Sequence, residues 1–562
     1  MKKIYSLLAL CIIAISVMAQ QTLPQWAQQL ITLNPGVIDS IFSYPQDPKG
    51  PNTRTYIIYY NQPLKHSAPD GGRFHMRATL TVFNDADPVT AINHVYCGGY
   101  ALYKQWLVRP DSLFVFDTLA SDVEIAHRYH ANYINLEHRY FQYSAPEKCY
   151  NNLDDLRAEE AAADFHNLFD ALKKVFKGKW VMSGTSKGGI TTLLQHTFYP
   201  QDFDIFVPYC APFFNTDRDT VMYTYWYKNG WNEEYQNMFM NVRKEALSNF
   251  DKIYNIFYKM TCNGDFSQSH ADSIYGSYLT CITGFGFLDH AYVDTATIRN
   301  QLYQNDSILK SHHLQYGDTV YAYMLSKCAF SLKDFKPWID TLRKYPEPKQ
   351  APRRYISRYD YKPFAVTEAQ WWGNDTIGKS EQAYEYQSKC ELGYYDYRFD
   401  LIVEDPVLAA QWNAVYKKYV GCLRDLSNPY FASRTFSDNL YNQTMTATKN
   451  ATKPIVFIYG FDDPWTGAAI KDEYVNGTNV HKFILPAQNH YVHFYSNTDP
   501  EKVNQIINIL DGVLLGTTDR LETVTDSHNP LFDGKTYNIL GMEVDENYRG
   551  IVIRNGKKYL QQ

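Results

Sequence analysis

Residues 184–188 have the types and spacing that nucleophilic catalysis requires. They read Gly-Thr-Ser-Lys-Gly, the pattern G-x-S-x-G, and Gly189 follows. A serine that is presented on a strained turn between a strand and a helix needs glycines two positions away, because side chains there would collide with neighbouring backbone. The bare pattern is weak, since roughly one random chain of this length in ten would contain it. An ordinary glycine–serine turn is the alternative.

The segments on either side of this pentapeptide favour the catalytic interpretation. Residues 180–182 are apolar and typical of a strand, and a helical pattern begins at Ile190. A serine between a strand and a helix is exposed at the turn, and the backbone N–H groups of the first helical turn face the place where an oxyanion forms. We therefore predict that Ser186 is a nucleophile.

A serine nucleophile needs a general base, and the base needs a carboxylate that orients it. The predicted strand 454–459 is followed by Asp463, and the predicted strand 481–485 is followed by His490. The order Ser, Asp, His along the chain fits this kind of fold, and the two later residues are 27 positions apart (490 − 463), which is one strand–helix–strand unit. The predicted catalytic residues are therefore Ser186, Asp463 and His490.

Each of the two later residues has a neighbour that is a rival. Asp462 is the alternative acid, but Pro464 fixes the backbone directly after Asp463 and favours the latter. His493 is the alternative base, and it is equally compatible with a place beside the substrate or in the core.

Two backbone N–H groups are expected to form the oxyanion hole. The first belongs to Lys187, the residue after the nucleophile. The second comes from the turn that follows Tyr96, at Gly98, Gly99 or Tyr100, and Gly99 is our choice among them. A plain glycine turn is the alternative interpretation of this segment.

Strands and helices alternate from about residue 55, which predicts a mostly parallel sheet with helices on both faces. We predict an α/β fold of the α/β-hydrolase kind, with a large, mostly helical cap inserted after the half that bears the nucleophile and a small C-terminal β tail. The expected strands are 56–60, 76–83, 92–96, 133–136, 180–182, 205–207, 454–459 and 481–485, and the clearest helices are 165–176, 190–198 and 506–514.

The chain of 562 residues is too long for one hydrophobic core. An independent inserted domain is the alternative to a cap, and a sorting tail or a stabilising flap are alternatives for the C-terminal module, which has an Asn-Gly hairpin signal. The predicted parts are a signal peptide (1–19), the first half of the hydrolase domain (20–213), the cap (214–450), the second half (451–516) and the C-terminal β module (520–562).

The N-terminus predicts export to the periplasm, the outer surface or the medium. Lys2 and Lys3 precede an apolar run that ends in a small residue, Ala19, as in a cleaved secretory signal. No later run is apolar enough to insert stably in a membrane. Cys11 lies in the removed segment, so eight of the nine cysteines remain, and we expect at least one disulfide, with buried thiols as the alternative.

Composition and spacing exclude several other classes. A net charge of −6 gives no basic field for nucleic acid. The sequence has neither the H-E-x-x-H nor the C-x-x-C spacing of metal sites, and it has no phosphate-binding glycine loop, so no metal or cofactor is expected. The sequence does not indicate an oligomeric state. Glu137 and Arg139, just after a predicted strand, suggest a structural ion pair rather than catalytic groups.

Four blocks occur in order along the chain: Glu137–Phe141, Glu160–Asp164, Gly184–Gly189 and Phe198–Asp202. Together they closely resemble the secreted prolyl tri- and tetrapeptidyl aminopeptidase family of serine peptidases. A more distant resemblance is to lysosomal Pro-Xaa carboxypeptidase and dipeptidyl peptidase II, which share an Asp-Pro-Trp at 463–465 and an Asn-His pair at 489–490.

The resemblance implies a peptidase that removes short peptides from free N-termini, often after proline. Residues 386–394 look like the Gln…Cys-x-Glu-x-Gly segment of the lysosomal pair and supply Glu391, which we expect to bind the substrate ammonium. A structural carboxylate is the alternative for Glu391.

The residues themselves leave other functions open, because one triad serves many substrates. The same triad would suit a dipeptidyl peptidase, a Pro-Xaa carboxypeptidase or a carboxylic-ester hydrolase. A non-catalytic binding protein is a further alternative, but the intact set of Ser186, Asp463 and His490 argues against it.

Overall fold

The computed structural model describes two compact units, 1–506 and 507–562, which we treat separately. The predicted signal peptide and most of the predicted cap lie outside the described residues. These residues are 23–43, 53–102, 122–146, 153–222, 224–225, 243–261, 278, 383–384, 386–395, 406–415, 434–496, 498–516, 536–538, 550–554 and 557–561.

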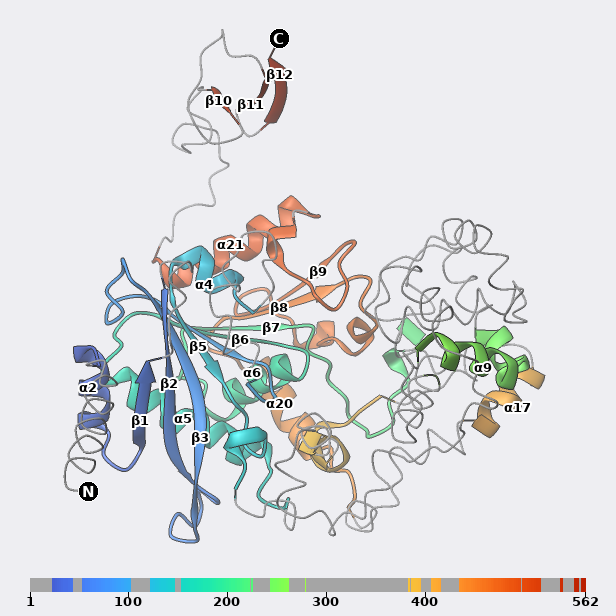
Figure 1. The fold of residues 1–562 in the computed structure, drawn as a ribbon, viewed down its shortest axis with the longest axis horizontal. Helices are drawn as coiled ribbons and strands as arrows, with labels where there is room; N and C mark the ends of the chain where they lie inside the picture. Colours follow the sequence, from blue (N-terminus) through green and yellow to red (C-terminus); the bar gives the residue numbers. More distant parts are fainter. Residues whose placement is uncertain are drawn as a thin grey trace, which may run out of the picture. The chain divides into compact units, whose positions relative to one another are not determined.

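The first unit is built on a nine-stranded mixed sheet with the order β1-β2-β3-β5-β4-β6-β7-β8-β9 (Figure 1). Neighbours are antiparallel from β1 to β5 and parallel from β5 to β9. The strands are β1 (Ile38–Ser43), β2 (Thr53–Pro63), β3 (Arg73–Phe83), β4 (Asn93–Cys97), β5 (Asn132–Leu136), β6 (Trp180–Thr185), β7 (Ile205–Tyr209), β8 (Ile455–Gly460) and β9 (Val480–Leu485).

This order confirms the predicted α/β-hydrolase sheet. All eight predicted strands are present, and the structure adds β1 at the edge. The parallel part requires crossover connections. Helix α6 (Lys187–Phe198) connects β6 to its neighbour β7, and helix α5 (Ala158–Lys173) connects β5 to β6, with β4 between these two strands.

Helices pack on both faces of the sheet, because alternate strand residues point to opposite sides. On β4, Val95 belongs to the large core with helix α5, whereas Tyr96 packs with Val123 and Ala126 at helix α4. The helices around the sheet are α2 (Gln25–Leu33), α4 (Glu124–Tyr129), α5 (Ala158–Lys173), α6 (Lys187–Phe198) and α20 (Asn439–Lys449).

Helix α5 shows why the sequence pattern predicts this packing. Phe165, Leu168, Phe169 and Leu172 recur at three- and four-residue spacing, and all four are fully buried. Burial of each such side chain contributes about 1.5–3 kcal/mol. The helix therefore holds a fixed place against α6, whose N-terminus carries the residues around Ser186.

The structure describes a smaller share of the predicted cap and of the C-terminal tail than of the sheet and its helices. The described segments between the two halves of the sheet include α9 (Phe250–Thr261), the short helix η5 (Ser388–Leu392) and α17 (Pro406–Val415). Helix α21 (Pro500–Leu514) follows the sheet, and the tail forms a three-stranded antiparallel sheet of β10 (Thr536–Asn538), β11 (Gly550–Arg554) and β12 (Lys557–Gln561). The short strands predicted in the tail are therefore present.

Cys97, Cys210 and Cys390 are free, buried thiols. The other five cysteines of the expected mature chain lie outside the described residues, so the disulfide remains a prediction. Among the helices that the structure describes, none has both the length and the apolar character that a membrane crossing requires.

Candidate active site

Ser186 lies on a sharp turn between β6 and α6. Its backbone angles are φ 61° and ψ −121°, a left-handed conformation that non-glycine residues seldom adopt. Its N–H donates to the carbonyl of Tyr209 at 2.9 Å, and its own carbonyl accepts from Ile190 N–H at 3.0 Å. These bonds hold the strained turn in place and present Ser186 between strand and helix.

The glycines around Ser186 are required by the backbone that crosses behind them. A Cβ on Gly184 would lie 2.3 Å from the carbonyl oxygen of Gly188, and a Cβ on Gly188 would lie 1.9 Å from that of Cys97. A Cβ on Gly189 would meet the Tyr209 carbonyl at 2.7 Å. The structure therefore confirms the steric reason for the glycine pattern.

Gly188→Ala is expected to destabilise the fold strongly, because the carbonyl of Cys97 is backbone that cannot move aside. We expect a loss of about 3 kcal/mol or more in the free energy of unfolding, measured by denaturant titration. Gly98→Ala is the matched control, since its nearest neighbour is a side-chain atom at 3.9 Å. Equal stability of the two variants would contradict the close packing at the turn.

Asp463 and His490 meet at the carboxyl ends of β8 and β9. His490 Nδ1 lies 2.9 Å from Asp463 Oδ2, and the Asp463 side chain is fully buried. The other oxygen, Oδ1, accepts the N–H of Trp465 at 3.1 Å. Asp463 is thus held from both sides in the orientation that a base-orienting carboxylate needs.

The two loops can approach closely because Gly460 ends β8. A Cβ there would lie 2.4 Å from the carbonyl oxygens of both Gln488 and Asn489. Asp462 N–H donates to the Gln488 carbonyl at 2.8 Å, which ties the loops together. The sequence pattern did not single out Gly460, although it is the residue that allows this approach.

The geometry is in keeping with Asp463 rather than Asp462 as the acid and with His490 rather than His493 as the base. Asp463, and not Asp462, has its carboxylate on the His490 ring. Asp462 is half-buried, and this burial raises the pKa of its carboxyl. Burial lowers the pKa of His493. The catalytic roles themselves are part of the proposal below.

The surroundings of His490 are aromatic and hold a buried thiol. The Trp465 ring packs on the His490 ring with centroids 4.6 Å apart. Cys210, Asp463 and His490 place their ligand atoms within 4.8 Å of one another. A metal would need a thiolate, but burial and the Asp463 carboxylate raise the Cys210 pKa well above its ordinary value. The cluster therefore suits hydrogen bonding better than metal binding.

The turn after β4 packs directly against the start of α6. Gly99 has φ 77°, and a Cβ there would lie 3.0 Å from Gly188 N and 2.9 Å from Lys187 Cγ. The predicted oxyanion-hole residues, Lys187 and Gly99, are therefore neighbours in space.

Glu391 lies on η5 and is 5% exposed. One of its oxygens accepts Ala158 N–H at 2.8 Å, and the other lies 3.1 Å from Arg157 Nε. Burial raises its pKa to about 7. These contacts are those of a carboxylate at the N-terminus of α5, where the helix dipole favours an anion. The role as an ammonium anchor remains a hypothesis.

Glu137 and Arg139 do not pair with each other, so that part of the sequence interpretation is wrong. Glu137 binds Arg77 at 2.5 Å, and Arg139 binds Asp164 at 2.7 Å. Both residues lie beyond the end of β5, so strand alternation does not relate their side chains, and each side chain meets a different segment. Both pairs are buried and structural.

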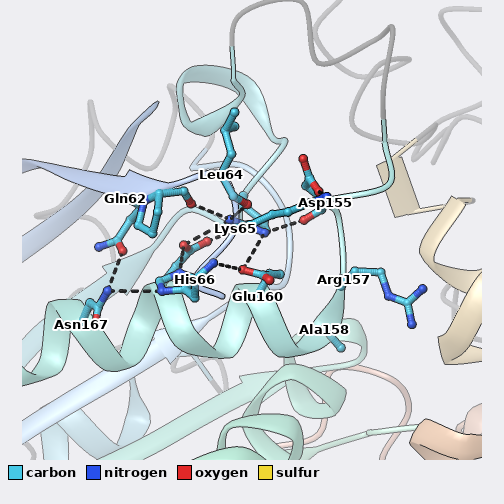
Figure 2. Close-up of polar contacts among 12 residues, drawn as sticks. Gln62, Leu64, Lys65, His66, Asp155, Arg157, Ala158, Glu160 and Asn167 are labelled. Carbon is cyan, nitrogen blue, oxygen red and sulfur yellow. Dashed lines mark hydrogen bonds and ion pairs between the residues drawn. The ribbon is translucent and has the colours of Figure 1, made fainter. Parts of the chain in front are cut away.

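Figure 2 shows a polar network that fixes the chain before α5. Lys65 Nζ binds Asp155 at 3.2 Å, and His66 N–H donates to Glu160 at 2.8 Å. His66 Nε2 also lies 2.8 Å from Asp164 Oδ1. The network positions the segment that leads to Arg157, and so it supports the contact between Arg157 and Glu391. Sequence analysis did not predict it, because its members come from distant segments.

The sheet order, the strained Ser186 turn and the Asp463–His490 pair are those of the α/β-hydrolase fold class. The sequence model of the family described as PS-10 peptidase S37 matches residues 42–301. The prolyl tri/tetrapeptidyl aminopeptidase of Streptomyces mobaraensis is 26% identical over 336 residues, 57% of this chain. The match spans 66% of that relative's length, slightly less than two thirds. Both matches confirm the resemblance to the prolyl tri- and tetrapeptidyl aminopeptidase family of serine peptidases.

Two of the solved structures that are similar to this chain are distant matches. A peroxisomal α/β-hydrolase of Saccharomyces cerevisiae is 11% identical, with a TM-score of 0.32 and coverage of 87% of this chain and 93% of that one. Proline iminopeptidase of Mycobacterium smegmatis is 11% identical, with a TM-score of 0.28 and coverage of 85% and 99%. The fold assignment rests on the strand order and on the Ser186 turn.

Proposed function

We propose that the protein is an exported serine exopeptidase that releases short peptides, in the first place tripeptides, from free N-termini. Proline is among the residues that we expect before the cleaved bond. The observation that carries the proposal is the 2.9 Å contact of His490 Nδ1 with buried Asp463, on loops of the sheet that also bears Ser186. The name of the Streptomyces relative supports the substrate class. Export rests on the pattern of residues 2–19.

The proposed reaction is acyl transfer through Ser186. His490 Nε2 takes the proton of Ser186 Oγ as the oxygen attacks the peptide carbonyl, and Asp463 holds the Nδ1–H side of the ring. Backbone N–H groups of Lys187 and of the turn 98–100 stabilise the oxyanion. The C–N bond then breaks as His490 protonates the leaving amine. Water hydrolyses the acyl-enzyme ester by the same proton transfers, and the released peptide leaves Ser186 free.

The described part of the predicted cap packs against the domain that carries these residues. Glu391 accepts the N–H of Ala158 at 2.8 Å, and the Tyr386 hydroxyl donates to Asp154 Oδ1 at 3.1 Å. The Tyr395 ring lies 5.9 Å from that of Trp465, which in turn packs on His490. A cap in this place supports an exopeptidase, because it restricts one end of the substrate path.

Acetylation of the substrate N-terminus is expected to lower kcat/KM by about 10²- to 10⁴-fold, because it leaves the group that binds the ammonium unpaired. The measurement compares chromogenic tripeptides that differ only in the acetyl group. A panel of chromogenic peptides with one to four residues shows how many residues the protein releases. Equal cleavage of free and blocked peptides would indicate an endopeptidase or an esterase instead.

The variant Glu391→Gln extends this measurement to the hypothetical anchor. If Glu391 binds the ammonium, the ratio of free to blocked kcat/KM should fall at least about tenfold, since the charge–charge contact is lost. If Glu391 only holds Arg157 and the start of α5, the ratio should stay constant while the melting temperature falls. The second result would assign Glu391 a structural role and leave the exopeptidase proposal intact.

A further inference from the structure

The side chain of Lys187 has a place that the proposed reaction does not explain. Lys187 is the first residue of α6, directly after Ser186, and only 1% of it is exposed. The reaction uses its backbone N–H alone. A buried ammonium is costly unless it has strong partners, so its contacts require a reason.

The Lys187 ammonium has one hydrogen-bond acceptor and three aromatic rings around it. Nζ donates to the carbonyl of Gly99 at 2.5 Å. It lies 5.3 Å from the ring centroid of Tyr100, 5.2 Å from that of Phe141 and 5.9 Å from that of Tyr384. Ring faces attract cations, most strongly away from water. In the described part of the chain, no carboxylate lies within ion-pair distance of Nζ.

The rings come from three separate segments. Tyr100 follows β4, Phe141 follows β5, and Tyr384 belongs to the part of the chain between the two halves of the sheet. Burial lowers the Lys187 pKa to about 7. Because Nζ donates to Gly99, the amine is directed at this turn and not at Ser186 as a base.

The bond to Gly99 fixes the direction of the next backbone amide. No described peptide bond is cis, and a trans peptide points its N–H away from its carbonyl. The Gly99 carbonyl and the Tyr100 N–H belong to the same peptide group. Because the carbonyl points to Lys187 Nζ, the Tyr100 N–H points away from Lys187 Nζ. The carbonyl of Tyr100 accepts His138 N–H at 2.9 Å, so the turn is held at two successive carbonyls.

We propose that the Lys187 ammonium is a positioning residue for the oxyanion hole: it holds the Gly99 carbonyl and thereby directs the Tyr100 N–H to the oxyanion. The proposal rests on the proposed acyl transfer through Ser186. It assigns the second oxyanion donor to Tyr100, where the sequence favoured Gly99. It also explains why a lysine with an aromatic enclosure follows the nucleophile.

The test replaces Lys187 by methionine, which keeps the backbone N–H and the apolar stem and removes the ammonium. Loss of a whole oxyanion donor costs about 10²- to 10³-fold in kcat, so a displaced donor should cost about 10- to 100-fold. The KM of a free tripeptide should change by less than about threefold, because ground-state binding does not use the oxyanion hole. Lys187→Arg should recover part of the lost kcat.

A pair of inhibitors separates positioning from a merely structural role. A peptide aldehyde forms a tetrahedral adduct with Ser186 and uses the oxyanion hole, whereas the corresponding peptide alcohol does not. In Lys187→Met the aldehyde should bind more weakly by the factor lost in kcat, and the alcohol should bind as to the wild type. Equal weakening of both inhibitors, or an unchanged kcat, would overturn the proposal.

The rate of labelling by a fluorophosphonate gives a readout that needs no peptide substrate. Phosphonylation of Ser186 also develops charge on an oxygen, so Lys187→Met should be labelled at least about tenfold more slowly. Lys187→Gln, which is neutral and shorter, gives the same test if the methionine variant folds poorly. Lys173→Met is the matched control, because Lys173 also lies near two rings, of Trp180 and Phe203, but on α5.

The outcomes for the inference and for the proposed function are distinguishable. A wild type that is labelled but cleaves no peptide would refute the exopeptidase proposal and leave the labelling comparison valid. A wild type that cleaves peptides, with Lys187→Met labelled as fast as Lys173→Met, would refute only the role of Lys187.

Discussion

Replacement of Ser186 by alanine is expected to lower kcat by about 10⁴-fold or more, while the protein stays folded. Without Oγ, no acyl-enzyme forms, and only transition-state binding by the rest of the site remains. Alanine and serine differ little at a half-buried turn position, so the melting temperature should change by no more than a few degrees. The measurement is kcat on a free tripeptide, together with a thermal melt. Activity within tenfold of the wild type would refute the assignment of Ser186.

A fluorophosphonate should label Ser186 in the wild type and no serine in the variant. Ser183 is an internal control, because it lies beside a histidine near this turn: its Oγ lies 2.7 Å from His94 Nε2. Both side chains are fully buried, and burial lowers the His94 pKa to about 3. Labelling of Ser183 would show that the probe reacts with a serine because it lies near a histidine, and not because it is an exposed nucleophile.

His490→Ala is expected to be as damaging as Ser186→Ala, because residues that act as one unit are strongly non-additive. The double variant should therefore be at most a few-fold worse than either single variant. His493→Ala is the matched control and should retain activity within about tenfold. If His493→Ala proves the more damaging change in kcat, the base is misassigned.

Asp463→Asn should cost about 10³- to 10⁴-fold in kcat, with KM little changed, because the amide favours the wrong tautomer of His490. The change is nearly isosteric, so the buried contact with Trp465 N–H should survive. Asp462→Asn is the control, and its kcat should stay within about tenfold of the wild type. A larger loss in Asp462→Asn would transfer the role of the acid to that residue.

The sequence was sufficient where a local pattern carries the physical requirement. Gly184 and Gly188 are needed because backbone passes behind the Ser186 turn, and any fold that presents the serine in this way needs them. The amphipathic stripe of α5 and the apolar runs of the strands likewise depend only on nearby residues. These features predicted the sheet, the turn and the places of Asp463 and His490.

The rest of the fold and of the candidate site depends on contacts between segments that lie far apart in the sequence. The strand order places β5 between β3 and β4, and this order follows from packing in three dimensions. Glu137 and Arg139 are two positions apart in the sequence, yet Glu137 pairs with Arg77 and Arg139 pairs with Asp164. The enclosure of Lys187 requires a ring from Tyr384, nearly two hundred positions later. No spacing rule predicts such contacts.

The pairing of β7 with β8 also determines when the proposed catalytic residues can come together during folding. Phe206 pairs with Ile455, so the parallel ladder is completed only after the whole intervening segment has been synthesised and its ends have met. Closing so long a loop has a large entropic cost and slows folding. Until it closes, Ser186 exists in a chain that has neither Asp463 nor His490 beside it. If these three residues form the proposed triad, a partly synthesised or still unfolded chain cannot hydrolyse neighbouring chains.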